Sequence, residues 1–135
     1  MKLTAELYLL TLTASATLLM WIPYMAARIV TRGLPATLNN PSPTYPADPA
    51  WAERAWRAHT NAIENFVVFA PLVLICALTD VSTPATVFAA KLYLVARLVH
   101  YVVYTAGIPV VRTVAFAAGF GATLVFATAL LGHAT

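Results

Sequence analysis

The sequence has few charged residues and almost no cysteine. Only 10% of its 135 residues are charged, whereas about a quarter of the residues in a soluble domain carry charge. A surface that faces water on all sides is therefore excluded. The eight Lys and Arg residues form no basic run, so we expect no nucleic-acid partner.

The single cysteine, Cys76, excludes an internal disulfide, and its apolar surroundings predict a small buried or lipid-facing residue. The three histidines form no metal-binding pattern, so we expect no metal.

The chain is rich in apolar residues. They make up 61% of the chain, and the mean hydropathy is +0.78. Four apolar segments, approximately 3–30, 58–78, 84–106 and 109–132, each approach or exceed the roughly 20 residues that cross a bilayer. The second helix is expected to begin before its apolar segment and to cover 49–79. Because lipid offers no partners to backbone groups, such segments are helical. The sequence predicts an all-α membrane protein, with one four-helix transmembrane domain over residues 1–135.

Three connections join these segments. The long one, "TRGLPATLNNPSPTYPADPAW", is rich in Pro and Asn and is typical of an ordered or semi-rigid loop. At its end, we expect Asp48 to cap the second helix and Pro49 to occupy the first helical position. The other two connections, around "TDVSTP" and "AGIP", are short, so consecutive helices are expected to be antiparallel neighbours.

The six arginines predict the orientation. With antiparallel helices they all fall towards the long loop, whereas Lys2 and Lys91 fall towards the opposite side. The positive-inside rule then places the long loop in the cytoplasm and both termini outside it.

Polar residues recur on two of the apolar helices at helical spacing. Arg57, Asn61 and Glu64 are spaced i, i+4, i+7 and share one helix face. Further polar residues fall at the same membrane depth: Arg97, His100 and Tyr104 on the third helix, Arg112 on the fourth, and Tyr24, Arg28 and Arg32 on the first. Ionisable groups within a membrane span are costly, so this cluster predicts a functional site.

These residue types suit one kind of ligand. Guanidinium groups bind carboxylates through paired hydrogen bonds, and Glu64 and Asn61 suit an amine or a peptide backbone. Tyr104 and Arg112 suit a thiol, because a nearby cation favours the thiolate. A short, acidic, zwitterionic peptide that carries a thiol meets all these requirements.

Structural interpretations of the same residues stay open. Arg57 can pair with Glu53 on an exposed helix face, and Glu64 can form a buried ion pair with Arg97. His100 taken alone is typical of a hydrogen-bonded core histidine, and Tyr24 of an aromatic residue at the membrane interface.

Two non-enzymatic functions also stay open. The chain can be a catalytically silent structural or accessory subunit of a membrane complex. A small four-helix exporter is the weakest alternative, because it requires an acidic residue deep within a helix and Glu6 lies only a few residues from the start.

Several stretches resemble one known family. The segments "RAHTNAIENFVVFAPLVL", "RLVHYVVY" and "PVVRTVAF" resemble the second, third and fourth helices of the MAPEG family, the membrane-associated proteins in eicosanoid and glutathione metabolism. The segments "WIPY" and "NNPSPTYPADPAWAERAWRAH" resemble its bacterial branch. The resemblance covers nearly the whole chain, in order and with similar spacing.

The resemblance implies a homotrimer in the bacterial inner membrane that binds glutathione between subunits near the cytoplasmic face. It implies a glutathione transferase or peroxidase that acts on lipophilic electrophiles, with glutathione as co-substrate. Arg112 would stabilise the thiolate. The glutathione-binding residues that it implies are Arg32, Arg57, Asn61, Glu64, Arg97, His100 and Tyr104.

Three positions depart from the family pattern. Thr60 stands where eicosanoid-forming members often have a basic residue, and Phe116 stands where some have a tyrosine that reaches the ligand. Thr113 follows Arg112 where some members have serine. These departures weigh against the eicosanoid-forming activities.

Overall fold

The computed structural model describes residues 2–134. These residues form six α-helices: α1 (Ala5–Leu19), α2 (Trp21–Arg32), α3 (Leu34–Leu38), α4 (Ala50–Leu78), α5 (Pro84–Ala106) and α6 (Pro109–His133). α1 and α2 continue one another, so that the described residues contain four spans long and apolar enough to cross a membrane. The predicted all-α, four-helix membrane fold is confirmed.

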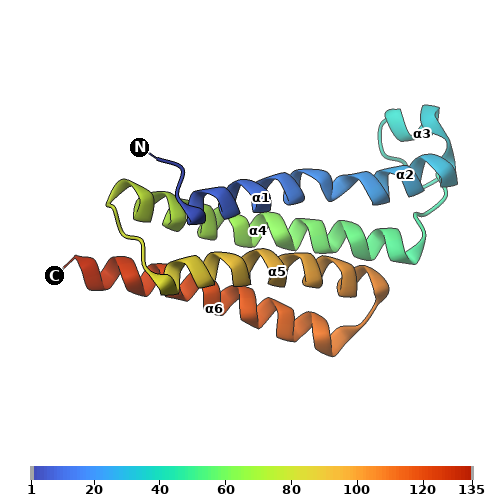
Figure 1. Cartoon of the computed structure of the whole chain (residues 1–135). Helices are drawn as coiled ribbons and strands as arrows, with labels where there is room; N and C mark the ends of the chain where they lie inside the picture. Colours follow the sequence, from blue (N-terminus) through green and yellow to red (C-terminus); the bar gives the residue numbers. More distant parts are fainter. Residues whose placement is uncertain (1, 135) are drawn as a thin grey trace.

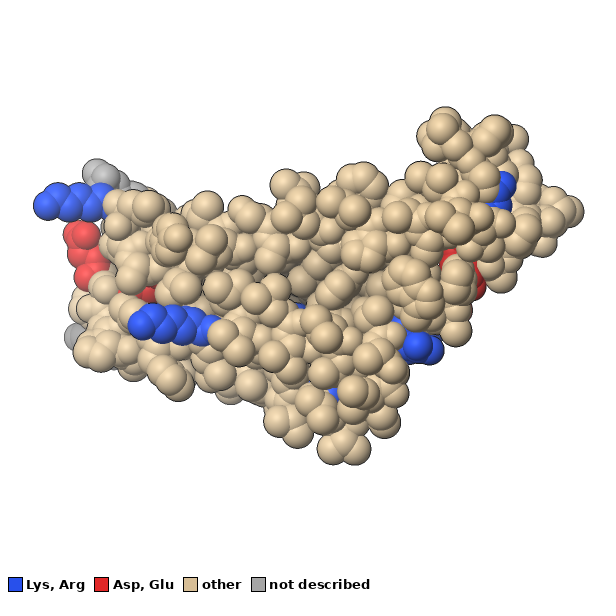
Figure 2. Space-filling view, turned by 45° about the vertical axis from the view of Figure 1, so that its right-hand side comes forward, with Lys and Arg blue, Asp and Glu red and all other residues tan. Residues whose placement is uncertain are grey.

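The spanning helices run side by side as a bundle (Figure 1). Both ends of the chain lie at one end of the bundle, which we call the terminal end. The α5–α6 turn and the segment between α2 and α4 lie at the other, which we call the loop end. On the face shown in Figure 2, charged side chains gather towards these two ends. This is the distribution that a bilayer-spanning bundle requires.

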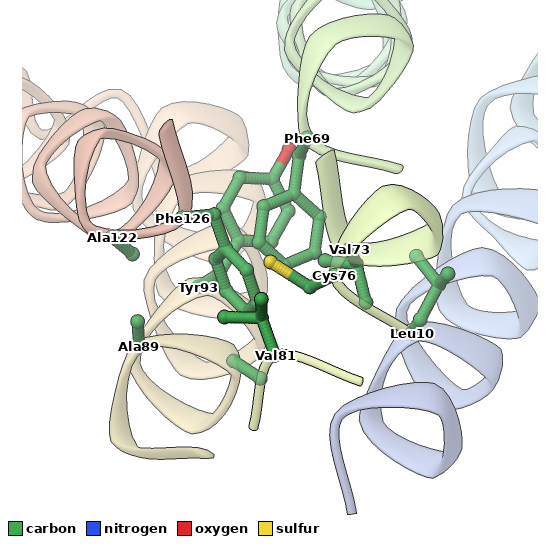
Figure 3. Close-up of a cluster of buried hydrophobic side chains, with 10 residues drawn as sticks. Leu10, Phe69, Val73, Cys76, Val81, Ala89, Tyr93, Ala122 and Phe126 are labelled. Carbon is green, nitrogen blue, oxygen red and sulfur yellow. The ribbon is translucent and has the colours of Figure 1, made fainter. Parts of the chain in front are cut away.

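An aromatic cluster packs α4, α5 and α6 together on the side of Arg97 that faces the terminal end. Phe69 of α4 stacks on Tyr93 of α5 with ring centroids 3.6 Å apart, and Phe126 of α6 meets Phe69 edge-on at 5.5 Å. Cys76 is buried in the same cluster, as expected (Figure 3). Phe69 and Phe126 have the edge-on geometry that aromatic pairs favour, whereas Phe69 and Tyr93 stack face to face. The cluster therefore fixes three helices one turn away from Arg97, which follows Tyr93 by four residues on α5.

The first span is broken at Met20, where a single helix over residues 3–30 was expected. Pro23 has no backbone N–H, so it cannot bond the Leu19 carbonyl as a helical residue would. The Tyr101 hydroxyl of α5 donates a hydrogen bond of 2.9 Å to the Met20 carbonyl. The break therefore coincides with the helical hydrogen bond that Pro23 cannot make. The hydrogen bond from Tyr101 stabilises the chain at this point.

The residue expected to cap α4 has another role. Pro49 is the N-cap residue of α4, which has no side-chain cap. Asp48 instead accepts hydrogen bonds from Arg28 (2.7 Å) and Arg32 (2.8 Å) of α2. We call these three residues the Asp48 clamp. The prediction that Asp48 caps α4 is wrong, because two guanidinium groups offer stronger, charge-assisted hydrogen bonds than a backbone N–H does.

The Asp48 clamp predicts a pH-dependent stability. The hydrogen bond from Arg28 lowers the pKa of the Asp48 carboxyl below its usual range. Stabilisation by such a group is present above the unfolded-state pKa, about 3.9, and is lost as the pH falls through the lower folded-state pKa. We expect Asp48→Asn to lower the unfolding free energy at neutral pH by about 1.5–3 kcal/mol.

The measurement is thermal unfolding of the detergent-purified protein over a range of pH. The difference between wild type and Asp48→Asn should vanish once the pH is below the folded-state pKa. Asp80→Asn is the matched control, because Asp80 is exposed and forms no ion pair within residues 2–134. Equal effects of the two substitutions at neutral pH would contradict the role of the clamp.

Candidate functional site

Two adjoining cavities open at the loop end of the bundle. The inner cavity, about 260 Å³, is lined by Asn61, His100, Tyr104, Arg112, Thr113 and Phe116. The outer cavity, about 280 Å³, is lined by Trp56, Arg57, Thr60, Asn61, Glu64 and Tyr104. Because Asn61 and Tyr104 line both, the two cavities are adjacent, and we call them together the polar hollow between α4, α5 and α6.

The inner cavity contains a stack of aromatic and cationic groups. The Arg112 guanidinium lies over the Tyr104 ring at 4.4 Å, and the Tyr104 ring meets His100 edge-on at 5.5 Å. Pro109 begins α6, which places Arg112 in its first turn. The N-terminal end of a helix carries partial positive charge. The guanidinium and the helix end therefore create a strongly positive region that attracts an anion.

Arg97 lies behind the inner cavity as a buried cation. Its side chain is only 3% exposed, and its Nη2 donates to Asn61 Oδ1 at 2.6 Å. The same nitrogen lies 3.5 Å from His100 Nδ1. Arg97 passes close to α6 at Gly119, where an added Cβ would lie 3.5 Å from Arg97 Cδ. Arg97 therefore ties Asn61 of α4 and His100 of α5 together at the floor of the site.

Arg97 forms no salt bridge with any carboxylate of the described residues. The Glu64–Arg97 ion pair, which the sequence left open, does not form within these residues. Asn61 occupies the position on α4 that reaches Arg97, whereas Glu64, almost one turn further on, is exposed beside the outer cavity. The positive charge at the floor of the site is therefore not neutralised within residues 2–134.

One arginine and one carboxylate, Arg57 and Glu64, line the outer cavity, and a second carboxylate, Glu53, is bonded to Arg57. Arg57 bonds Glu53 at 2.7 Å, and both side chains are exposed. This confirms the i, i+4 pair that the sequence left open. Glu64 makes no hydrogen bond or ion pair with any other described residue, although it lies within a membrane-spanning helix. Its carboxylate is available to a cationic group.

Two residues of the first span lie away from these cavities. Arg32 belongs to the Asp48 clamp and lines neither the inner nor the outer cavity. Tyr24 is buried, and its hydroxyl lies 3.0 Å from His59 Nδ1. Tyr24 therefore packs against α4 inside the bundle and does not face lipid, as an aromatic residue of the membrane interface would.

An apolar groove continues from the outer cavity along α4 and α6. It has a volume of about 350 Å³ and is lined by Glu64, Asn65, Val68, Leu72, Phe120, Thr123, Leu124 and Ala127. Sequence reasoning did not identify this groove. The signal was present, because Phe120, Leu124 and Ala127 are spaced i, i+4, i+7 on one face of α6. Since Glu64 lines both spaces, the polar hollow and the groove are adjacent.

Four membrane-spanning helices that surround a polar hollow at one end place this chain among the integral membrane proteins. The sequence profile of the MAPEG family matches residues 9–132, and the chain belongs to this family. Its curated relatives include microsomal glutathione S-transferase 1 of Bos taurus and of Sus scrofa, each 35% identical over 80 residues. Each match covers 58% of this chain and 52% of the relative, so the chain spans about half the length of these relatives.

Because Arg97 lies close to α6 at Gly119, we expect only a small side chain to be tolerated at position 119. Gly119→Ala adds only an ordinary contact with Arg97 Cδ and favours the helix by up to about 1 kcal/mol. Gly119→Leu overfills the contact, and we expect a loss of about 1–3 kcal/mol of unfolding free energy.

The measurement is again thermal unfolding in detergent, with Gly121→Leu as the matched control. A Cβ at Gly121 would meet nothing within 4 Å, so this substitution on the same helix should be tolerated. If Gly119→Leu is tolerated equally well, Arg97 is not held against α6 as described.

Proposed function

We propose that this protein binds glutathione or a related thiol in the hollow at the loop end and transfers it to a lipophilic electrophile. One observation carries the proposal. The buried Arg97 guanidinium has no carboxylate partner within residues 2–134 and lies directly behind a cavity that also contains Arg112. An unpaired buried charge is costly, and a bound anion compensates it.

The charges around the hollow match a zwitterionic peptide. Arg57 is paired with Glu53, which leaves Arg112 at the inner cavity and Arg97 behind it as cations without a carboxylate partner among residues 2–134. Glu64 is a free carboxylate at the outer cavity. A ligand with anionic groups, a carboxylate or a thiolate, towards the arginines and an ammonium group towards Glu64 satisfies both. Glutathione has these groups as well as a thiol, and the relatives are named as glutathione S-transferases.

Arg112 is the proposed thiolate-stabilising residue. Its guanidinium lies over Tyr104, and both line the inner cavity. A thiol bound there loses its proton to water, and the cation beside it stabilises the sulfur anion. The thiolate then forms a bond to carbon of the electrophile, and the leaving group departs with its bonding electrons. The proposed chemistry needs no metal and no organic cofactor besides the thiol.

The apolar groove between α4 and α6 is the proposed approach for the lipophilic substrate. It adjoins the outer cavity at Glu64 and otherwise has mainly apolar and small side chains. A substrate dissolved in the bilayer would reach the thiolate without entering water. Reduction of a lipid hydroperoxide by the same thiolate stays a prediction of the family resemblance.

The proposed assembly is a homotrimer in a bacterial inner membrane, with the loop end in the cytoplasm. Glu64 is exposed beside the outer cavity and belongs to a membrane-spanning helix, where lipid would otherwise cover it. A free carboxylate facing hydrocarbon is costly. A neighbouring subunit that covers Glu64 and the outer cavity removes the cost, encloses the bound thiol peptide and leaves the apolar groove open to the bilayer.

The role of Arg112 can be tested by following thiolate absorbance and turnover of an aryl halide with excess glutathione. Arg112→Ala should abolish the thiolate signal, while glutathione still binds. A charge-assisted contact to sulfur contributes about 1.5–3 kcal/mol, or about ten- to a hundredfold in rate. Glu64→Ala should instead weaken glutathione binding. Lys91→Ala is the control, because Lys91 is an exposed cation remote from the hollow.

Two results would contradict this proposal. Retention of the thiolate signal in Arg112→Ala would assign its stabilisation to another group. If wild-type protein neither binds glutathione nor forms a thiolate, the catalytically silent accessory subunit becomes the better interpretation. Arg97 and Asn61 then serve only to join α4 and α5.

The assembly can be tested by the detergent-corrected mass of the purified protein. A trimer of a 14.5 kDa chain is predicted, because in a closed ring of three copies each exposed Glu64 is covered by a neighbouring subunit. Glu64→Gln, which removes the charge but keeps the shape, is expected to leave the trimer intact. A mass of one or two chains under gentle extraction would contradict the proposed assembly.

A further inference from the structure

The connection between the first and second spans has an unusual composition. Its residues 33–47, "GLPATLNNPSPTYPA", include no Asp, Glu, Lys, Arg or His. About a quarter of the residues in an ordinary soluble domain are charged, so a water-exposed segment of this length would be expected to carry several charges. The absence of charge indicates a segment that is not wholly surrounded by water.

The structure places exposed apolar side chains at the start of this segment. Val30 of α2 is 87% exposed, and Leu34 and Leu38 of α3 are 51% and 76% exposed. We call these three residues the elbow face. Leu34 and Leu38 are four residues apart and therefore share one side of α3. This apolar surface is not covered by any other part of residues 2–134.

The direction of α3 follows from Gly33. Gly33 has φ +83° and ψ 159°, a conformation that residues with a Cβ rarely adopt. The chain turns sharply there, and α3 packs against α2. In Figure 1, α3 lies on the side of α2 away from α4, outside the bundle. The turn thus places α3 beside the end of the first span.

The opposite side of α2 is polar at the same level. Arg28 and Arg32 point to Asp48 and are held there by the clamp. The first span has 28 residues, which is about 42 Å of helix at 1.5 Å per residue, whereas the hydrocarbon core is about 30 Å thick. The end of α2 therefore extends to the headgroups. Apolar side chains on one side and arginines on the other are typical of an element at the lipid–water boundary.

We propose that the elbow face is inserted into the boundary between phospholipid headgroups and acyl chains, and that it anchors the long loop to the membrane. The anchored loop then leads through Asp48 to the start of α4, which carries the outer cavity. This proposal is independent of the chemistry at the hollow. It identifies the partner of the elbow face as lipid rather than water or a second copy of the chain.

Site-directed spin labelling in vesicles of phosphatidylcholine and phosphatidylglycerol tests the proposal. Cys76 is the single cysteine, so Cys76→Ala gives a cysteine-free background. Labels are then placed in separate variants at Leu38→Cys and Leu34→Cys. Collision with oxygen, which enters lipid, is compared with collision with a nickel chelate, which stays in water. We expect oxygen collisions to dominate at both leucines, at a depth of about 5–10 Å below the headgroups.

Two reference positions calibrate the measurement. Val95→Cys, at an exposed position in the middle of α5, should report the membrane interior, and Asn40→Cys, at an exposed position in the loop, should report water. Dominant nickel collisions at both leucines would overturn the proposal in favour of a water-exposed elbow. Low collision rates with both reagents would overturn it in favour of contact with another protein chain.

Discussion

The arrangement of the hollow depends on one buried contact, the hydrogen bond from Arg97 to Asn61. A guanidinium that is 3% exposed and has no carboxylate partner within residues 2–134 needs compensation. The amide oxygen of Asn61 supplies part of it at 2.6 Å. Gly119 supplies the space, because α6 can approach the Arg97 side chain closely only where no larger residue intervenes. The contact therefore determines how α4, α5 and α6 meet around the inner cavity.

The two ends of α4 are stabilised in different ways. Towards the terminal end, the Phe69–Tyr93–Phe126 cluster packs three helices through apolar contact. At the loop end, the Asp48 clamp holds the segment before α4 against α2. Polar residues thus lie between an apolar core and a charged clamp. Because the aromatic cluster and the Asp48 clamp are separate from the cationic cavity, the cavity does not disturb the packing of the apolar core.

Much of this fold could be predicted from the sequence, because hydropathy reports directly on lipid exposure. The polar faces of α4 and α5 followed from helical spacing, and residues of both faces line the hollow. Partners between helices were harder to predict. Spacing places Asn61 and Glu64 on one face of α4, but it does not say which of them reaches Arg97. The Asp48 clamp joins residues 16 and 20 positions apart in the sequence. Helical periodicity relates residues of one helix and therefore could not predict this contact. The break at Met20 was indicated by Pro23.

The central claim is that the cationic hollow at the loop end binds an anionic thiol peptide. The most direct measurement is isothermal titration of the detergent-purified protein with glutathione and, in parallel, with its diethyl ester, in which both carboxylates are blocked. The account predicts saturable binding of glutathione and binding of the diester that is weaker by at least about tenfold, since each charge-assisted contact contributes about 1.5–3 kcal/mol. Equal affinity for the two compounds, or no saturable heat with glutathione, would contradict the account.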